Sequence, residues 1–302
     1  VQEWLERTVR RPQVRRIMTS LAWTFVYSAA LDLVSAEVFV RKLQITLKNP
    51  VHYVDGGWQA LVDGLRRTAE AAGARIVSGE AVAAVEHDGG RVGAVRLADG
   101  GTVPASSVIV ATNPHDAVKL LGDGAYPALR GIVEGMYPAQ VACLDVALRR
   151  LPRPGYPAAE DLDRPLFYSA QSLFARVAPE GEALVHAFKQ LDPRQPGDPR
   201  EDERELEELL DAGQPGWREQ VVKRVYLPRI AAVGMLPTAG GGGFAGRPGV
   251  QVPGVPNLFL AGDWIGPEGF LSDACMASAR QAARLLAAPG RSATREPAAM
   301  TA

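Results

Sequence analysis

The chain has 302 residues, of which 47% are hydrophobic and 22% are charged, with a formal net charge of −1. This length is sufficient for two domains with hydrophobic cores, and a net charge near zero excludes a protein that gathers nucleic acid through a strong overall field. No apolar run reaches the roughly 18 residues that a membrane span requires.

The two cysteines, Cys143 and Cys275, are far apart in the sequence and do not form a Cys-x-x-Cys motif. They give no support to a zinc site or a disulfide framework, and they indicate a reducing compartment such as the cytoplasm.

The first 49 residues are expected to be helical. Trp4 and Leu5 share one side of a first helix that Pro12 should end or bend. A further helix is expected over residues 35–47, and the strongly apolar residues 21–34 suit either a buried helix or the wall of a channel for a lipophilic molecule. Five arginines gather here, and they indicate either a solvated helix surface or a contact with a membrane surface. They are Arg7, Arg10, Arg11, Arg15 and Arg16.

Residues 50–125 alternate between strand and helix patterns. A short strand at 51–54 is followed by a helix that begins at Trp58, keeps its apolar residues at helical spacing and ends at Gly73. The remaining strands of this part are expected over residues 74–77, 82–86, 92–97, 102–103 and 108–111. The last of them is continuously apolar, which is typical of a parallel strand buried on both faces. This order of elements indicates α/β layering.

Residues 126–235 have the pattern of a second module. Antiparallel strands are expected over 141–148, 165–169 and 183–188, and an acidic helix over 200–210. We interpret the charge run at 201–208 as a solvated helix face.

The last part of the chain begins with a loop rich in Gly and Pro, residues 236–256. A buried strand at 257–261 and a long Ala-rich helix at 272–288 follow it. The polar residues from 290 to 302 are expected to be a disordered tail.

One Gly-x-Gly-x-x-Gly sequence occurs, formed by Gly241, Gly243 and Gly246. Such a sequence binds a dinucleotide when it joins a strand to a helix whose N-terminus faces the phosphates. Here Arg-Pro-Gly follows at 247–249, which cannot open that helix. We therefore interpret these glycines as part of a loop.

A stronger signal lies at the end of the strand over residues 258–261. Gly262 and Asp263 follow directly, at the carboxyl end of a strand, where α/β sheets bind ligands. The glycine lets the backbone approach a ligand closely, and the carboxylate can accept hydrogen bonds from hydroxyl groups. The loop at 266–271 then opens a helix whose first N–H groups are unpaired and can stabilise negative charge.

This succession of strand, Gly-Asp, glycine-containing loop and Ala-rich helix resembles the C-terminal FAD signature of the phytoene desaturase and flavin amine oxidase superfamily. The resemblance implies that Asp263 binds the ribityl chain of FAD and that backbone groups of residues 270–272 contact the isoalloxazine ring. The cofactor-binding residues that it implies in this part are Gly262, Asp263, Trp264, Gly269, Phe270, Leu271 and Ser272.

A second stretch supports the same resemblance. Residues 53–62, YVDGGWQALV, are similar to the superfamily's Gly-Gly segment before a helix. The resemblance implies backbone contacts of Val82 with the adenine side of FAD, and it adds Ala111 and Thr112 to the cofactor site. Asn113 departs from the pattern, because related flavoproteins often carry glycine there.

Together these stretches cover residues 50–290, and the resemblance implies an α/β fold. A Rossmann-like FAD-binding domain, incomplete at its N-terminus, would carry an inserted α+β substrate domain. The implied parts are substrate-domain helices at 1–49, the middle of the FAD-binding domain at 50–125, the substrate domain with its antiparallel sheet at 126–235, the C-terminal part of the FAD-binding domain at 236–289, and the tail at 290–302. The superfamily has a Gly-x-Gly-x-x-Gly segment ahead of these helices, so we expect that segment upstream of Val1 or on a separate chain.

The resemblance implies an FAD-dependent oxidoreductase that removes a hydride from a lipophilic substrate, as phytoene desaturases do. Flavin amine oxidation is an alternative, and a non-catalytic binding protein similar to GDP-dissociation inhibitors is an alternative from another class. The partner would be a small lipophilic or amine molecule and not nucleic acid, with peripheral membrane contact as a further option.

The sequence assigns no catalytic acid or base and no metal site. Its histidines do not have the spacing of a metal site, and no convincing Ser–His–Asp set is present. Flavin chemistry needs neither, because the cofactor itself accepts the hydride. The four histidines are His52, His87, His115 and His186.

Overall fold

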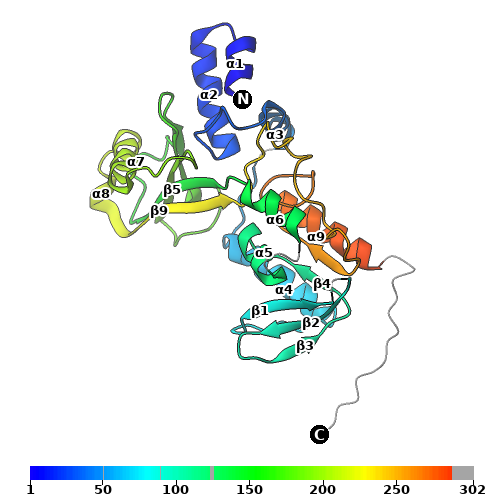
Figure 1. Ribbon diagram of the computed structural model, residues 1–302. Coiled ribbons are helices and arrows are strands. Elements are labelled where there is room, and N and C mark those ends of the chain that lie inside the picture. Colours follow the sequence, from blue (N-terminus) through cyan, green and yellow to red (C-terminus); the bar gives the residue numbers. More distant parts are fainter. Residues whose placement is uncertain (50, 89, 123–125, 288–302) are drawn as a thin grey trace. The chain divides into compact units, whose positions relative to one another are not determined.

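The computed structural model of the chain describes residues 1–49, 51–88, 90–122 and 126–287 and shows a mixture of helices and strands (Figure 1). These residues divide into two units. The first unit is built from residues 1–77 and 137–243, and the second from residues 78–136 and the described residues from 244 onward. Each unit therefore joins two stretches of chain that are far apart in the sequence.

The boundaries of the units differ from the expected domain boundaries in three places. Residues 51–77 and 236–243 belong to the first unit, whereas the resemblance groups them with the cofactor-binding domain. Residues 126–136 belong to the second unit, whereas the resemblance groups them with the substrate domain. The division into units does not show which part binds the cofactor and which binds the substrate, so those domain assignments stay predictions. The expected tail at 290–302 lies outside the described residues.

The N-terminal stretch of the first unit is helical, as expected. Pro12 is the first residue of the second helix, a position that tolerates a residue without a backbone N–H. The rings of Trp4 and Phe25 lie 6.2 Å and 6.3 Å from the ring of the buried Phe39, so the first three helices share one apolar contact. The apolar stretch at 21–34 is helical only as far as Val26. The helices are α1 (Gln2–Thr8), α2 (Pro12–Val26), α3 (Ala36–Lys48) and α4 (Trp58–Ala71).

Helix α4 confirms the predicted helix after the Gly-Gly turn, but it buries none of its residues. Its apolar stripe is exposed instead, with 61% of Trp58 and 53% of Leu65 accessible. An amphipathic helix normally turns such a stripe toward a core. The stripe is therefore a surface suited to contact with another element.

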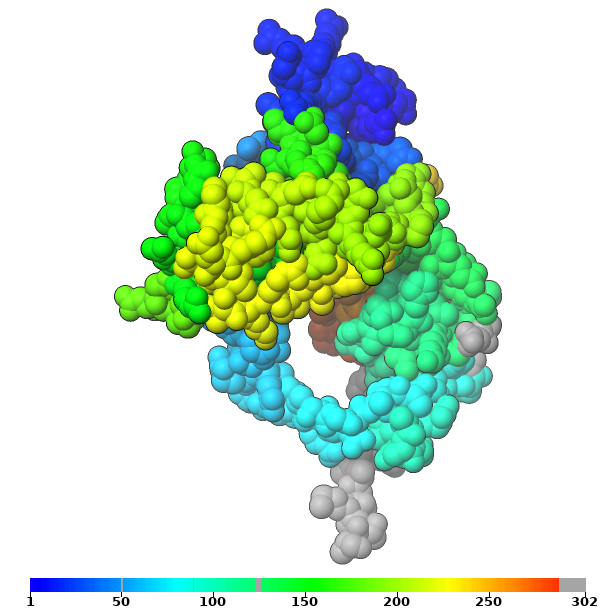
Figure 2. All heavy atoms as spheres, turned by 90° about the vertical axis from the view of Figure 1, so that its left-hand side faces the viewer, coloured from blue at the N-terminus to red at the C-terminus, as the bar shows by residue number. Residues whose placement is uncertain are grey.

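The first unit contains an antiparallel sheet with the strand order β6-β7-β8-β5-β9. The predicted strands at 141–148, 165–169 and 183–188 are confirmed as β5, β7 and β8. Alternate residues of these strands, such as Leu144 and Val185, pack with Leu206 and Leu210 of α7 in one hydrophobic core, as the two-residue period of a strand requires. In Figure 2, α7, α8 and β9, coloured yellow-green to yellow, form one continuous face of this unit. The elements are β5 (Ala139–Leu148), β6 (Ala158–Glu160), β7 (Leu166–Ala170), the 3-10 helix η1 (Gln171–Leu173), β8 (Ala183–Gln190), α7 (Pro199–Gly213), α8 (Trp217–Gln220) and β9 (Val221–Val233).

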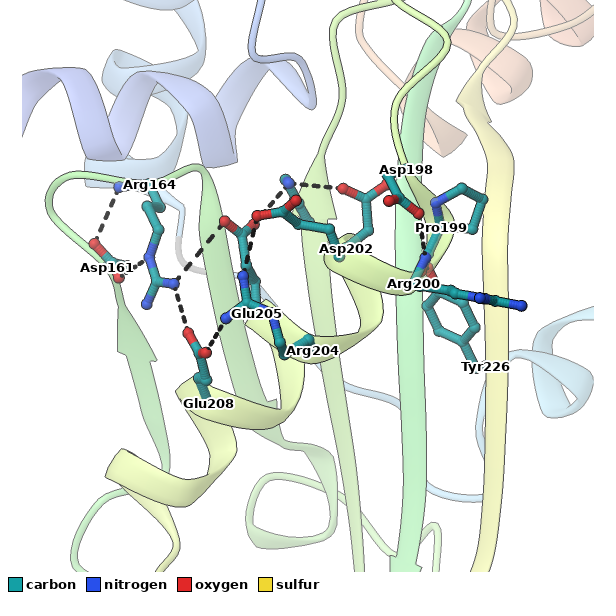
Figure 3. Close-up of polar contacts among 12 residues, drawn as sticks. Asp161, Arg164, Asp198, Pro199, Arg200, Asp202, Arg204, Glu205, Glu208 and Tyr226 are labelled. Carbon is teal, nitrogen blue, oxygen red and sulfur yellow. Dashed lines mark hydrogen bonds and ion pairs between the residues drawn. The ribbon is translucent and has the colours of Figure 1, made fainter.

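The acidic run on α7 is not simply a solvated face, and this part of the sequence interpretation was wrong. Asp202 is only 4% exposed, and Lys189 of β8 lies 2.7 Å from its carboxylate and 2.6 Å from that of Glu205. Arg164 contacts Glu208, 2.9 Å away, at the next turn of the helix (Figure 3). A buried charge needs such partners, so the acidic residues fasten α7 to the sheet.

The strands predicted at 51–54 and 74–77 are absent from the described structure. A strand is stabilised by pairing with a neighbouring backbone, and short apolar runs do not show whether a partner exists. The turn that follows residues 51–54 is hydrogen-bonded to the loop that contains Arg176. Asp55 Oδ1 accepts a hydrogen bond from the Arg176 backbone N–H at 2.8 Å, and the Gly56 N–H donates to the Arg176 carbonyl at 2.9 Å.

The second unit contains two small sheets. Strands β1, β2 and β3 form the predicted antiparallel meander, and β4 pairs in parallel with β10. The two continuously apolar runs predicted as strands at 108–111 and 257–261 therefore lie in one sheet. Strand β4 is not buried on both faces, since Ile109 is 40% exposed. The elements are β1 (Val82–His87), β2 (Val92–Leu97), β3 (Thr102–Pro104), β4 (Val108–Val110), α5 (Pro114–Leu121), α6 (Pro127–Glu134), β10 (Leu258–Leu260) and α9 (Ser272–Ala287).

Asn257 joins the two sheets of this unit. Its side-chain oxygen accepts a hydrogen bond from the Val92 N–H at 2.9 Å, and its side-chain nitrogen donates to the carbonyls of Val92 and Ser106, both at 2.8 Å. Asn257 is buried, so these bonds satisfy an otherwise costly polar group. They fix the start of β10 beside the meander.

No helix in the described part of the chain is both long and apolar enough to cross a membrane. Within the same residues, no group of three or more His, Cys, Asp and Glu side chains could hold a metal ion. Cys143 and Cys275 are both free thiols.

Candidate functional site

The predicted cofactor residues gather where β4 and β10 end. The two strands are parallel, and Ala261 N–H donates to the Val110 carbonyl at 3.0 Å, so Thr112 and Asp263 leave the same edge of the sheet. The indole N–H of Trp264 donates to the Thr112 carbonyl at 3.0 Å. Trp264 is buried, and its side chain therefore joins the two strand ends.

A single serine fixes the strand end to helix α9. Ser278 Oγ accepts a hydrogen bond from the Gly262 N–H at 3.0 Å and lies 2.7 Å from the Ala274 carbonyl oxygen, to which it can donate. Ser278 is buried, so the bonds are shielded from water. They hold Gly262 against the first turns of the helix.

The loop before α9 is shaped by glycine. A Cβ atom on Gly269, whose φ is +78°, would lie 2.8 Å from the backbone nitrogen of Ala274. Only glycine therefore lets the loop lie so close to the helix. Leu271 also has a positive φ, +53°, which is uncommon for a residue with a side chain and is typical of ligand-binding loops. Helix α9 begins at the next residue, Ser272.

Arg247 is the feature of the site that the sequence did not predict. It is 6% exposed, its Nη1 donates to the Gly269 carbonyl at 2.9 Å, and its guanidinium lies 4.7 Å from the ring of Phe244 and 5.7 Å from that of Phe270. Within the described residues its Nε and Nη2 have no hydrogen-bond partner. Its sequence signal was only an Arg-Pro pair after a glycine-rich loop, which does not reveal burial.

Charge and burial oppose each other at Arg247. Burial lowers the pKa of the guanidinium to about 10, and the nearby carboxylate of Asp263 acts in the opposite direction. Burial also raises the pKa of the Cys275 thiol, and Asp263 adds to that shift. Arg247 and Cys275 thus both lie within the field of the Asp263 carboxylate.

These residues fit one half of an FAD site. Two buried donors of Arg247 lack partners among the described residues, and a ligand with acceptor atoms would satisfy them. The N-terminus of α9 favours negative charge, and Asp263 can accept hydrogen bonds from a polyol. FAD offers both features, since its ribityl chain carries hydroxyl groups and its ring edge carries acceptors.

The predicted position Val82, and Asn113, which departs from the family pattern, have different surroundings. Val82 begins β1 and pairs with Leu97, on the sheet that does not contain β4 and β10. Asn113, where the family pattern has glycine, caps α5, because its side-chain oxygen accepts a hydrogen bond from the Asp116 N–H at 2.9 Å. The roles of Val82, Ala111 and Thr112 toward FAD stay predictions.

The interpretation of Gly241, Gly243 and Gly246 as a loop is confirmed. No helix begins between residues 241 and 271, all of which are described. A Cβ atom on Gly243, with φ +62°, would lie 3.2 Å from Ser35 Oγ, so this glycine serves packing within the first unit.

Parallel strands that deliver a glycine and a carboxylate to a helix N-terminus define the class of α/β proteins that bind a dinucleotide at a sheet edge. Residues 10–285 match the family described as FAD dependent oxidoreductase. The chain belongs to this family, and FAD is the family's cofactor. A comparison with curated protein sequences found no significant match.

Several solved structures share the fold. An oxidoreductase from Methanosarcina mazei has 17% identity and a TM-score of 0.74, with 94% of this chain and 67% of that chain covered. A protein from Pyrococcus furiosus has 17% identity and a TM-score of 0.65, with 94% and 66% covered. Cyclohexylamine oxidase from Brevibacterium oxydans has 16% identity and a TM-score of 0.61, with 94% and 66% covered. The chain thus spans about two thirds of the length of these three structures.

Proposed function

We propose that this chain, within a complete cofactor-binding protein, oxidises a lipophilic substrate by removal of a hydride, as in phytoene desaturation. When bound, FAD accepts that hydride. The observation that carries the proposal is the edge formed by Asp263 and the loop before α9, where Arg247 has two buried donors without partners in the described residues. The lipophilic nature of the substrate rests on the sequence resemblance and on the apolar stretch at residues 21–34.

The residues of this edge would have separate tasks. Asp263 accepts hydrogen bonds from the ribityl hydroxyls, and Gly262 allows the close approach. The first N–H groups of α9 and the charge of Arg247 make the potential near the ring edge positive, which favours the electron-rich reduced form of the ring. In this proposal no side chain of the edge acts as an acid or base.

Amine oxidation is a second candidate, because the structures with this fold include cyclohexylamine oxidase and a putrescine oxidase with a TM-score of 0.65. A non-catalytic binding protein is the candidate from another class. The unpartnered donors of Arg247 favour a protein that keeps its cofactor over one that has lost it.

The proposal also includes contact of the N-terminal arginines with a membrane surface. Of the five N-terminal arginines, three take partners within the first unit: Arg7 pairs with Glu3, Arg15 donates to the Val9 carbonyl, and Arg16 pairs with Asp163. The location in this proposal is cytoplasmic, and peripheral membrane contact would depend mainly on Arg10 and Arg11, which are exposed.

The test is anaerobic reduction of the flavin in the full-length natural protein. A lipophilic isoprenoid in detergent, offered both as the hydrocarbon phytoene and as an isoprenoid alcohol, is expected to bleach the visible absorbance of the oxidised flavin in at least one form, and cyclohexylamine is expected to leave it unchanged. Bleaching by cyclohexylamine alone would favour amine oxidation. A purified protein that binds no flavin would overturn the enzymatic proposal and favour the binding protein.

A further inference from the structure

The face of the five-stranded sheet that is turned away from α7 carries a pair of ionisable side chains. Asp145 of β5 and His186 of β8 lie directly opposite each other. They alternate with Val146 and Val185, which belong to the core shared with α7, so the pair lies on the other face. Their side chains are 31% and 38% exposed.

Asp145 sets the orientation and the tautomer of the imidazole. Its Oδ1 lies 2.6 Å from His186 Nδ1. A carboxylate can only accept a hydrogen bond, so the proton of the neutral imidazole is on Nδ1. The acceptor of the ring is then Nε2, at the side of the ring away from Asp145.

His186 also lines a cavity of about 790 Å³ that lies within the first unit. This volume is in the range of small-molecule binding sites. Much of the wall is apolar or aromatic, with Trp58, Leu184 and Tyr53 among the lining residues. The ring of Tyr53 is stacked on that of Phe174, with centroids 5.1 Å apart, and this contact restricts the position of the Tyr53 ring.

The other polar groups around the imidazole are mostly engaged. Arg176 lines the cavity, but its guanidinium is paired with Asp55 at 2.7 Å. Ser169, opposite His186 on β7, is 2% exposed and accepts a hydrogen bond from Gln171 at 2.7 Å. His52 is the second histidine of the lining. The cavity thus combines an apolar wall with an oriented acceptor, His186 Nε2.

We propose that this cavity binds the substrate, and that His186 Nε2 accepts a hydrogen bond from one N–H or O–H group of an otherwise apolar molecule. Asp145 is a positioning residue, since it acts through the imidazole. The inference rests on the proposed function in naming the ligand as the substrate, and it narrows that substrate to a lipophilic molecule with a donor group, which a pure hydrocarbon such as phytoene lacks. An amine and an alcohol share this chemistry.

The test compares three probes that share the same phenyl ring and differ in their polar group: toluene, benzyl alcohol and benzylamine. Their affinities for the full chain are measured by titration calorimetry, with and without FAD. Each donor probe is expected to bind at least about tenfold more tightly than toluene, which is about 1.4 kcal/mol. His186→Phe should remove this preference and leave the affinity for toluene unchanged. His115→Phe is the control, because His115 is an exposed histidine of α5 in the second unit.

A change at the orienting carboxylate separates a positioned hydrogen-bond acceptor from a merely structural histidine. In Asp145→Asn the tautomer is no longer fixed by a carboxylate, and the preference for the donor probes should be reduced but present.

Two results would overturn the inference: toluene binding as tightly as the donor probes, or the preference surviving in His186→Phe. If that variant does not fold, nitrogen NMR of the wild-type histidines replaces it. The Nε2 signal of His186 must then shift with benzylamine and not with toluene. A preserved donor preference without flavin reduction by any substrate would refute the proposed function and keep the binding site. Substrate turnover that is unaffected by His186→Phe would refute the proposed binding site and keep the proposed function.

Discussion

At the scale of single residues, Asp263 is the side chain whose removal tests the cofactor site most directly. Asp263→Ala in the complete protein removes a charge-assisted hydrogen bond worth about 1.5–3 kcal/mol, so FAD affinity should fall roughly 10- to 150-fold. Flavin fluorescence titration measures this loss. Thermal stability without cofactor should change much less. Equal FAD affinity in variant and wild type would contradict the role assigned to Asp263.

Arg247→Met is the matched comparison at the same edge. It removes a buried guanidinium with two donors that have no partner in the described residues, and each such group destabilises a protein when no ligand satisfies it. This variant should therefore lose FAD affinity while its stability without cofactor stays equal or rises. A simple packing role would lower both quantities together.

The sequence allowed Asp263 to be predicted as part of this site, but not Arg247. Gly262 and Asp263 follow a strand end, which is a local pattern, and the family resemblance gave that pattern a meaning. The burial of Arg247 depends on Phe244, Phe270 and the Gly269 carbonyl, and local sequence does not show that these groups enclose a guanidinium. The dyad of Asp145 and His186 was missed for the same reason, since register between strands pairs residues far apart in the chain.

At the scale of elements, the attachment of α7 to the sheet depends on Lys189. Burial disfavours the charge of Lys189, but its ion pairs with Asp202 and Glu205 outweigh burial and raise its pKa. A raised pKa in the folded state stabilises the protein at every pH below the unfolded value of about 10.4, and this stability is lost as pH rises through the folded pKa. Lys189→Met should lower the free energy of unfolding by about 3 kcal/mol near neutral pH.

Urea denaturation at neutral and at strongly alkaline pH measures the contribution of Lys189. The difference between the variant and the wild type should shrink in alkali, because the wild-type lysine is then neutral as well. Lys223→Met, which changes an exposed lysine on β9, is the control and should stay close to the wild type. A difference that grows with pH would show that the ion pairs do not stabilise α7.

Elements were predictable where a local period was clear. The strands β5, β7 and β8 follow from alternation, and α4 and α9 from helical spacing and their glycine boundaries. The 13 residues of β9 (Val221–Val233) were missed, because Lys223, Arg224 and Arg229 interrupt the apolar pattern. These residues are tolerated since much of β9 is exposed. Conversely, residues 51–54 have strand composition but no partner strand in the described structure.

At the scale of the whole molecule, the second unit contains a small parallel sheet beside the predicted cofactor residues. Strands β4 and β10 form a sheet of two, Ile109 is 40% exposed, and the described residues contain no strand that leads through glycines into a helix at a pyrophosphate. The chain purified by itself should therefore be colourless while keeping much of its secondary structure. A strand–Gly-x-Gly-x-x-Gly–helix segment, supplied in cis or as a second chain, should restore the yellow colour.

Absorbance and circular dichroism of the two preparations measure this difference. A segment with its three glycines replaced by alanine is the matched control, because it keeps the strand and helix but obstructs the phosphate turn. A soluble yellow preparation of this chain alone, with FAD released on denaturation, would show that the cofactor-binding elements have been misplaced.

The pairing of β4 with β10 also has a consequence for synthesis on the ribosome. Val108 pairs with Leu258, about 150 residues later in the chain, which at about 5–20 residues per second leaves β4 waiting on the order of 10 s for its partner. The antiparallel sheet of the first unit lies almost wholly between these two strands and can form during that delay. The antiparallel sheet can therefore form before β4 and β10 pair, and β4 stays without this partner strand until residues 258–260 have been synthesised.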